Sequence, residues 1–151
     1  MQLTQKETGL LKDLKDQEQL CADKYAKHSS CASDPQLKNL FSSLAQVERT
    51  HYDTVCQMEQ GTVPQMMSSS DQSKPSFTAT YGGVNSPEKQ ADMYLCSDLL
   101  ASEKHVSQLY DTCIFEFKDE NARNALNHIQ KEEQQHGKLI YDYMQINGMY
   151  S

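Results

Sequence analysis

The sequence lacks the features that define several large functional classes. Its net charge is −7, so it has no excess of basic residues to displace the counterions around a nucleic acid. It contains no apolar run of about 18 residues, as a transmembrane helix would require. The first twenty residues carry too many charges for the apolar segment of a signal peptide. We therefore expect no nucleic-acid partner, no membrane span and a cytoplasmic location by default.

Cysteine is present but forms none of the usual patterns. The chain has five cysteines, an odd number that cannot form a closed set of disulfides, and their spacings match no zinc motif. The absence of paired thiolates disfavours a structural zinc site. We expect most of them to be reduced, packed thiols: Cys21, Cys31, Cys56, Cys96 and Cys113.

Helical periodicity fills most of what remains, and capping signals divide it into four segments. The length of 151 residues suits one domain with a sizeable core. Apolar residues recur every three or four positions over residues 4–60 and 87–148, which predicts two helical hairpins. The predicted N-caps are Thr4 with Glu7, Asp34 before Pro35, Ser86 before Pro87, and Asp119. The stretch from His28 to Ser33 is expected to turn the chain between the first two helices.

Residues 61–86 differ from the rest because they are rich in Gly, Ser, Thr and Pro and show no helical period. A connection of this length can run along a whole helix of about 28 residues, which is about 40 Å long. We interpret it as a long crossover between the second and third helices. The sequence thus predicts an all-α, four-helix bundle.

One pattern occurs twice in the chain, 85 residues apart. A lone glutamate, a tyrosine seven residues later and a Glu-x-x-His motif appear in each hairpin. The lone glutamate precedes the Glu-x-x-His glutamate by 30 residues in both copies. The simplest account is a duplicated helical hairpin with pseudo-two-fold symmetry. The repeated residues are Glu18, Tyr25, Glu48 and His51 in the first copy, and Glu103, Tyr110, Glu133 and His136 in the second.

The four glutamates stand at positions where the helical pattern calls for apolar residues. Four carboxylates that face one core cannot all stay ionised without positive charge nearby. Glutamate and histidine three residues apart on a helix project from the same face. We therefore predict a binuclear metal centre in which two iron or manganese ions are held by Glu18, Glu48, His51, Glu103, Glu133 and His136.

Two alternatives stay open at this stage. Tyr25 and Tyr110 follow their glutamates on the same helical face, where each hydroxyl is expected either to orient a ligand carboxylate or to be an ordinary core hydroxyl. The whole cluster could also be the remnant of a metal site, now held together by shared protons or water. The other histidines are not expected to be ligands: His28 is predicted near a helix end, and His105 and His128 are predicted to be exposed.

The doubled Glu-x6-Tyr and Glu-x-x-His pattern resembles the ferritin, bacterioferritin and rubrerythrin superfamily. That resemblance implies a single ferritin-like domain over residues 1–151 and a binuclear centre that reacts with oxygen or peroxide. The chain has no Cys-x-x-Cys pair, so the rubredoxin-type module of rubrerythrins is missing. Whether this protein is an enzyme, such as a di-metal oxidase, peroxidase or catalase, is left open.

Residues 93–150 also resemble the coat F domain of spore coat proteins, through the stretches DLLASEKHVSQLYDT and KEEQQHGKLIYDYMQINGMY. This resemblance implies a protein of the sporulating mother cell or of the spore coat, with other coat proteins as partners. The rival function is therefore a non-catalytic coat component, cross-linked through cysteines and through tyrosines such as Tyr141, Tyr143 and Tyr150. Nothing in the sequence indicates a ferritin-type storage cage, and a homodimer is left open.

Overall fold

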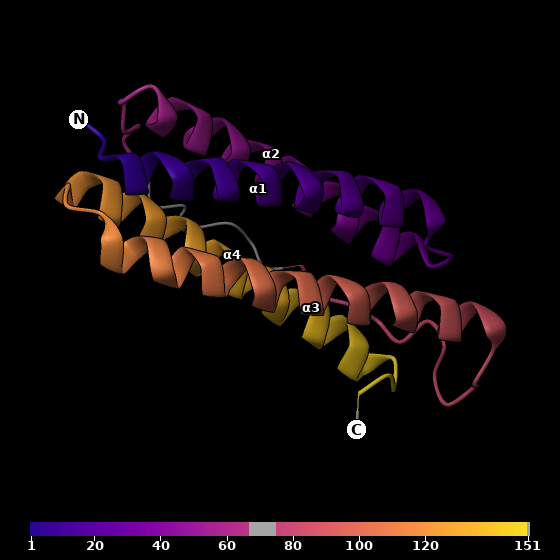
Figure 1. The fold of residues 1–151 in the computed structure, drawn as a ribbon. Coiled ribbons are helices and arrows are strands. Elements are labelled where there is room, and N and C mark those ends of the chain that lie inside the picture. Colours follow the sequence, from indigo (N-terminus) through magenta and orange to yellow (C-terminus); the bar gives the residue numbers. More distant parts are fainter. Residues whose placement is uncertain (67–74, 151) are drawn as a thin grey trace.

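The computed structural model describes residues 1–66 and 75–150, and these residues form four helices and no strand. The helices are α1 (Gln5–Cys31), α2 (Pro35–Glu59), α3 (Pro87–Glu116) and α4 (Glu120–Ile146). Figure 1 shows them as two antiparallel pairs, with α1 beside α2 and α3 beside α4. The all-helical, four-helix prediction is confirmed. In the part of the chain described, no helix is long and apolar enough to cross a membrane.

The predicted caps are confirmed at all four helix starts. Thr4 and Glu7 form a reciprocal capping box, in which each side chain accepts a hydrogen bond from the backbone N–H of the other residue. Asp34, Ser86 and Asp119 each accept a hydrogen bond from a backbone N–H in the first turn of α2, α3 and α4. These polar bonds satisfy N–H groups that have no partner within the helix.

The predicted turn after α1 was placed too early. The helix continues through His28 to Cys31, and only residues 32–34 leave the helical conformation. The polar run that suggested a turn stays helical because its side chains find partners there. Ser29 Oγ donates to the carbonyl of Lys38 on α2, and His28 Nε2 lies 2.8 Å from Asp98 Oδ2 on α3.

The connection from α2 to α3 has its two ends at opposite ends of the bundle. At one end, the amino group of Met1 donates to the carbonyl of Gly61, which has a φ of 87° that favours glycine. At the other end, the backbone N–H of Thr80 donates to Asn147 after α4. Figure 1 shows the same separation. The middle of the predicted crossover, residues 67–74, lies outside the described residues.

The hydrophobic core is divided into two apolar clusters along the bundle axis. The first gathers around Leu14, Val106 and Ile129, and the second around Phe41, Leu99 and Ile140. Neither cluster includes the four glutamates at the predicted site, although these are also buried. The fold therefore sets a polar group of side chains within an otherwise apolar interior.

Candidate metal centre

The structure brings all six predicted ligands together, with contributions from every helix. Each helix presents its ligand on the face that it buries, because the ligand continues the apolar stripe of that helix. Each of the six residues is at most 4% exposed: Glu18, Glu48, His51, Glu103, Glu133 and His136. Buried carboxylates are costly unless they are paired or bind cations, so this layer requires compensation of its charge.

Two overlapping groups of these residues could each hold a metal ion. One group consists of Glu18, Glu48, His51 and Glu133, and the other of Glu48, Glu103, Glu133 and His136. Within each group the candidate ligand atoms all lie within 4.8 Å of one another. Glu48 and Glu133 belong to both groups, whereas each imidazole belongs to one. The imidazole rings of His51 and His136 stack with their centroids 5.9 Å apart.

Unsatisfied polar atoms are concentrated at this cluster. Among the described residues, every buried side-chain nitrogen or oxygen without a hydrogen-bond partner belongs to one of its members. His51 Nδ1 lies only 2.7 Å from Glu133 Oε1, but the two atoms are not aligned for a hydrogen bond. Such buried atoms are rare in folded proteins and call for a partner such as an ion or water. The unpartnered atoms are Glu18 Oε2, Glu48 Oε2, His51 Nδ1, Glu103 Oε2, and both Oε1 and Oε2 of Glu133.

The electrostatics of the cluster show how it is held without metal. Burial, together with the negative charge of Glu48, raises the pKa of Glu18 to about 8. Burial also raises the pKa of Glu133 well above its usual range. Burial opposes charge at Glu48 as well, but the hydrogen bond from His136 and the nearby imidazole of His51 outweigh it and hold the Glu48 pKa well below its usual range. Both shifts favour the protonated form, at Glu18 and at Glu133.

Both histidines of the cluster favour their charged form. Burial lowers the pKa of His136, but its interactions with Glu103 and Glu48 are stronger and raise it to about 9. In the same way, neighbouring carboxylates raise the pKa of His51 well above its usual range against the effect of burial. Protons thus supply the positive charge of the metal-free cluster. A metal ion that binds here has to displace them.

The two tyrosines form reciprocal hydrogen bonds across the bundle. The hydroxyl of Tyr25 on α1 donates to Glu103 Oε1 on α3 at 2.6 Å. The hydroxyl of Tyr110 on α3 donates to Glu18 Oε1 on α1 at 2.5 Å. Each bond occupies one oxygen of a lone glutamate and leaves its Oε2 without a partner. Both tyrosine hydroxyls therefore contact a carboxylate of the cluster.

Sequence reasoning missed Glu132, which precedes Glu133 in the second copy. Its Oε1 lies 3.1 Å from His51 Nε2 and 3.2 Å from His128 Nε2, so it links the cluster to the side of α4. The prediction that His128 is exposed was wrong, because this pairing leaves it only 23% exposed. A break in the repeat could have pointed to Glu132, since the residue 85 positions before it is Val47.

The remaining histidines and cysteines lie outside the cluster. His105 is exposed, and His28 pairs with Asp98 between α1 and α3. All five cysteines are free thiols, and Cys21, Cys96 and Cys113 are buried. Burial raises the pKa of each of these three thiols, so they are protonated and poor metal ligands near neutral pH.

Comparison with known proteins finds a family match for one part of the chain. Residues 91–151 match the family model of the Coat F domain, which takes in most of α3 and all of α4. This region includes Glu103, Glu133 and His136. No curated protein matches the chain, and no solved structure matches it either. Residues 91–151 are therefore similar in sequence to the Coat F domain.

Proposed function

We propose that this chain is a ferritin-like spore coat protein with a binuclear iron or manganese carboxylate centre that reacts with oxygen or peroxide. The observation that carries the proposal is the pair of four-residue groups that share Glu48 and Glu133. The unpartnered buried atoms at the same place fit the need for cations. The connection from α2 to α3, whose ends lie at opposite ends of the bundle, fits the crossover of a ferritin-like fold.

Each residue has a distinct part in holding the ions. Glu18 and His51 would serve one ion and Glu103 and His136 the other, as single-ion ligands. Glu48 and Glu133 would serve both ions. Six ligands for two ions leave coordination positions for reactants. Carboxylate and imidazole donors suit iron and manganese, and these metals would supply redox chemistry toward oxygen or peroxide.

The rest of the site keeps these ligands in place. Tyr25 and Tyr110 fix one oxygen each of Glu103 and Glu18, which limits the orientations that each carboxylate can take. Glu132 orients the ring of His51 through its Nε2 atom, so that Nδ1 faces the carboxylates. The two apolar clusters exclude bulk water along the bundle axis. Low local polarity strengthens the interactions between the ligands and a cation.

The match to the Coat F domain supports the spore coat as the location and other coat proteins as partners. The ligands of α3 and α4 lie in the matched region, whereas those of α1 and α2 lie outside it. The internal repeat extends the proposal to the first hairpin.

Elemental analysis and activity together test this proposal. Protein reconstituted with Fe²⁺ or Mn²⁺ and then desalted is expected to retain two ions per chain and to consume peroxide. The Glu133→Ala variant is expected to lose both properties, because it removes a carboxylate from both groups. Wild-type protein that retains no metal would exclude the centre. Equal peroxide consumption by metal-loaded wild type and by Glu133→Ala would exclude a role for the centre in the reaction.

A second candidate function is a non-catalytic coat component that is cross-linked through exposed tyrosines. The rings of Tyr141 and Tyr150 lie 4.5 Å apart, and Tyr150 is 43% exposed. Tyr143 does not belong with them as the sequence suggested, because it is buried and donates a hydrogen bond to Asp34. If the protein extracts from mature coats entirely as a monomer, this candidate fails.

A further inference from the structure

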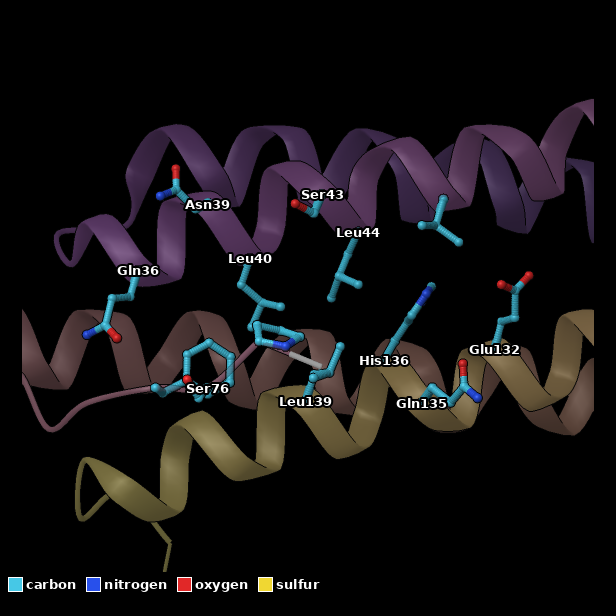
Figure 2. A pocket seen from close by; sticks show the side chains of 13 residues that line it. Gln36, Asn39, Leu40, Ser43, Leu44, Ser76, Glu132, Gln135, His136 and Leu139 are labelled. Atoms are coloured by element: carbon cyan, nitrogen blue, oxygen red, sulfur yellow. The ribbon is translucent and has the colours of Figure 1, made fainter. Parts of the chain in front are cut away.

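A cavity separates α2 from α4 and reaches the candidate metal centre from the side. The helices within each hairpin pack closely, whereas α2 and α4 touch at few positions. The space between them has a volume of about 460 Å³. Figure 2 shows Leu40 and Leu44 of α2 facing Leu139 and His136 of α4 across it. His136 and Glu132 also line the cavity, so it ends beside the carboxylate cluster.

The size of this cavity exceeds what oxygen or peroxide requires. A water molecule occupies about 30 Å³ of liquid, and sites for small organic ligands begin at about 300 Å³. The cavity therefore has room for a molecule of one or two rings. It is also partly open to solvent, since Ser43 and Gln135 at its rim are exposed while Leu40 and Leu44 are buried.

The lining determines the chemical class of the occupant. Leucine, valine, proline and phenylalanine side chains supply apolar surface, and Gln36, Asn39, Ser43 and Gln135 supply uncharged hydrogen-bonding groups. Among residues 1–66 and 75–150, no lysine or arginine lines the cavity, so these residues offer an anion no counter-charge. The carboxylate of Glu132 is already paired with His51 and His128, which leaves little attraction for a cation. The lining thus favours a neutral, mainly apolar molecule with a hydrogen-bonding group.

His136 is the polar group at the inner end. It is 4% exposed, and its Nδ1 forms a hydrogen bond with Glu48 Oε1 at 2.9 Å. Among residues 1–66 and 75–150, no hydrogen bond is formed by its Nε2. His51, by contrast, has its Nε2 engaged by Glu132. The residues equivalent to Glu132 and His128 beside His136 are Val47 and Ser43, and both line the cavity.

We propose that the cavity between α2 and α4 binds a neutral, mainly apolar organic molecule of phenol-like character, with its polar group directed at His136. The binding itself depends only on the cavity and its lining. The closeness of the bound molecule to a metal ion rests on the proposed function. Two measurements separate these two parts.

The first measurement is an NMR titration of the metal-free protein with phenol, monitored through backbone amide shifts. Saturable shifts are expected at residues of the cavity walls, such as Leu44 and Leu139. The variant Ser43→Trp places a large ring in the cavity and is expected to weaken binding at least tenfold. Ser42→Trp is the matched control, because Ser42 is the exposed neighbour on the same helix and does not line the cavity. Gln135→Trp blocks the opposite wall and replaces Ser43→Trp if that variant does not fold.

Charged analogues test the chemical class in the same titration. Phenyl phosphate and benzylamine are expected to bind at least tenfold more weakly than phenol. Equal or tighter binding of either analogue would overturn the assignment to a neutral ligand. Non-saturable shifts with phenol, or equal binding by wild type and a folded, cavity-blocked variant, would overturn the proposal as a whole.

The second measurement uses protein loaded with Co²⁺, whose visible absorption reports on the metal's surroundings. Phenol at a saturating concentration is expected to change this spectrum in wild type and in Ser42→Trp, but not in Ser43→Trp. An unchanged spectrum in Co²⁺-loaded wild type would overturn the placement of the ligand beside the centre. Failure of the protein to bind Co²⁺ would count against the proposed metal centre, while the titration of the metal-free protein still decides whether the cavity binds phenol.

Discussion

His51 and His136 hold equivalent positions in the two hairpins, yet their surroundings differ. Each has a glutamate three residues before it and a lone glutamate from a neighbouring helix close by. His51 is held from its other side by Glu132, whereas the position equivalent to Glu132 beside His136 is Val47. One half of the centre is therefore closed by a carboxylate, and the other half opens to a cavity. The two copies of the repeat thus share their candidate ligands but differ in the residues beside them.

The largest expected effect comes from removing what the two halves share. The Glu133→Ala variant is expected to bind at most one ion per chain, because both groups lose a carboxylate. Each bound ion should stabilise wild type by about 2.7 kcal/mol at a metal concentration 100 times its Kd. Thermal unfolding with and without Mn²⁺ measures the total stabilisation by bound metal, which should fall by at least half in the variant. Lys131→Ala, an exposed position on the same helix, should keep the full gain; an undiminished gain in Glu133→Ala would contradict a shared carboxylate.

The next largest effect is a loss of metal affinity in the half of the centre that contains His51. The Glu132→Gln variant weakens the bond that orients His51, and residues of this kind typically contribute about 10- to 100-fold in metal affinity. We expect one of the two binding steps to weaken by such a factor and the other to stay unchanged. Calorimetric titration with Mn²⁺ resolves the two steps.

Val47→Ala is the matched variant in the other half, and it should leave both binding steps unchanged, because Val47 offers no bond to His136. If Glu132→Gln weakened both steps equally, the two halves would not be distinct in the way that the structure indicates.

A smaller effect is expected from the tyrosines that tie the halves together. Tyr25→Phe and Tyr110→Phe each remove a buried hydrogen bond to a carboxylate, which should lower the free energy of unfolding by about 1–3 kcal/mol. Tyr143→Phe removes a similar bond to Asp34, away from the centre. Denaturant unfolding should therefore show comparable losses for all three variants. Metal affinity should fall only for Tyr25→Phe and Tyr110→Phe, and a fall for Tyr143→Phe would contradict a role specific to the site.

The smallest effect is a dependence of stability on pH in metal-free protein. The pKa of His136 is raised above its unfolded value to about 9, so its stabilising contribution is complete below about pH 6.5 and is lost as pH rises toward 9. The pKa of Glu18 is raised to about 8, so the folded state loses stability as pH rises from about 4.5 to 8. Both shifts predict that the melting temperature of the metal-free protein falls between pH 6 and 9.

The stabilisation that a bound metal ion adds should change with pH in the opposite direction, because ligands that have lost their protons bind cations more tightly. The stabilisation by Mn²⁺ should therefore grow over the same pH range. A metal-free melting temperature that rises from pH 6 to 9 would contradict the charge states assigned to Glu18 and His136.

Most of the helical framework could be predicted from local signals. Caps such as Asp34 and Ser86 act within one turn of their helix, so a short stretch of sequence suffices to locate them. The end of α1 could not be placed in this way. Ser29 and His28 remain helical and have partners on other helices. Ser29 meets Lys38 on α2, nine residues further along the chain, and His28 meets Asp98 on α3, which is 70 positions away.

The candidate site was also predicted only in part from the sequence. Spacing alone selected Glu18, Glu48, His51, Glu103, Glu133 and His136, because the repeat keeps each of them on the buried stripe of its helix. Spacing could not reveal that Tyr25 bonds to the glutamate of the other hairpin, nor that Glu132 reaches His51 on α2. Their roles as metal ligands and as positioning residues remain predictions.

The sequence by itself determined that this protein has four helices and two matched sets of carboxylate and imidazole groups, since both depend on periodicity within a helix. Only the tertiary structure decided which residues the sets share, which tyrosine meets which glutamate, and where the centre opens to a cavity. The physical reason is distance along the chain. Contacts between residues some 70 to 90 positions apart depend on how the two hairpins pack, and local pattern carries no record of that packing.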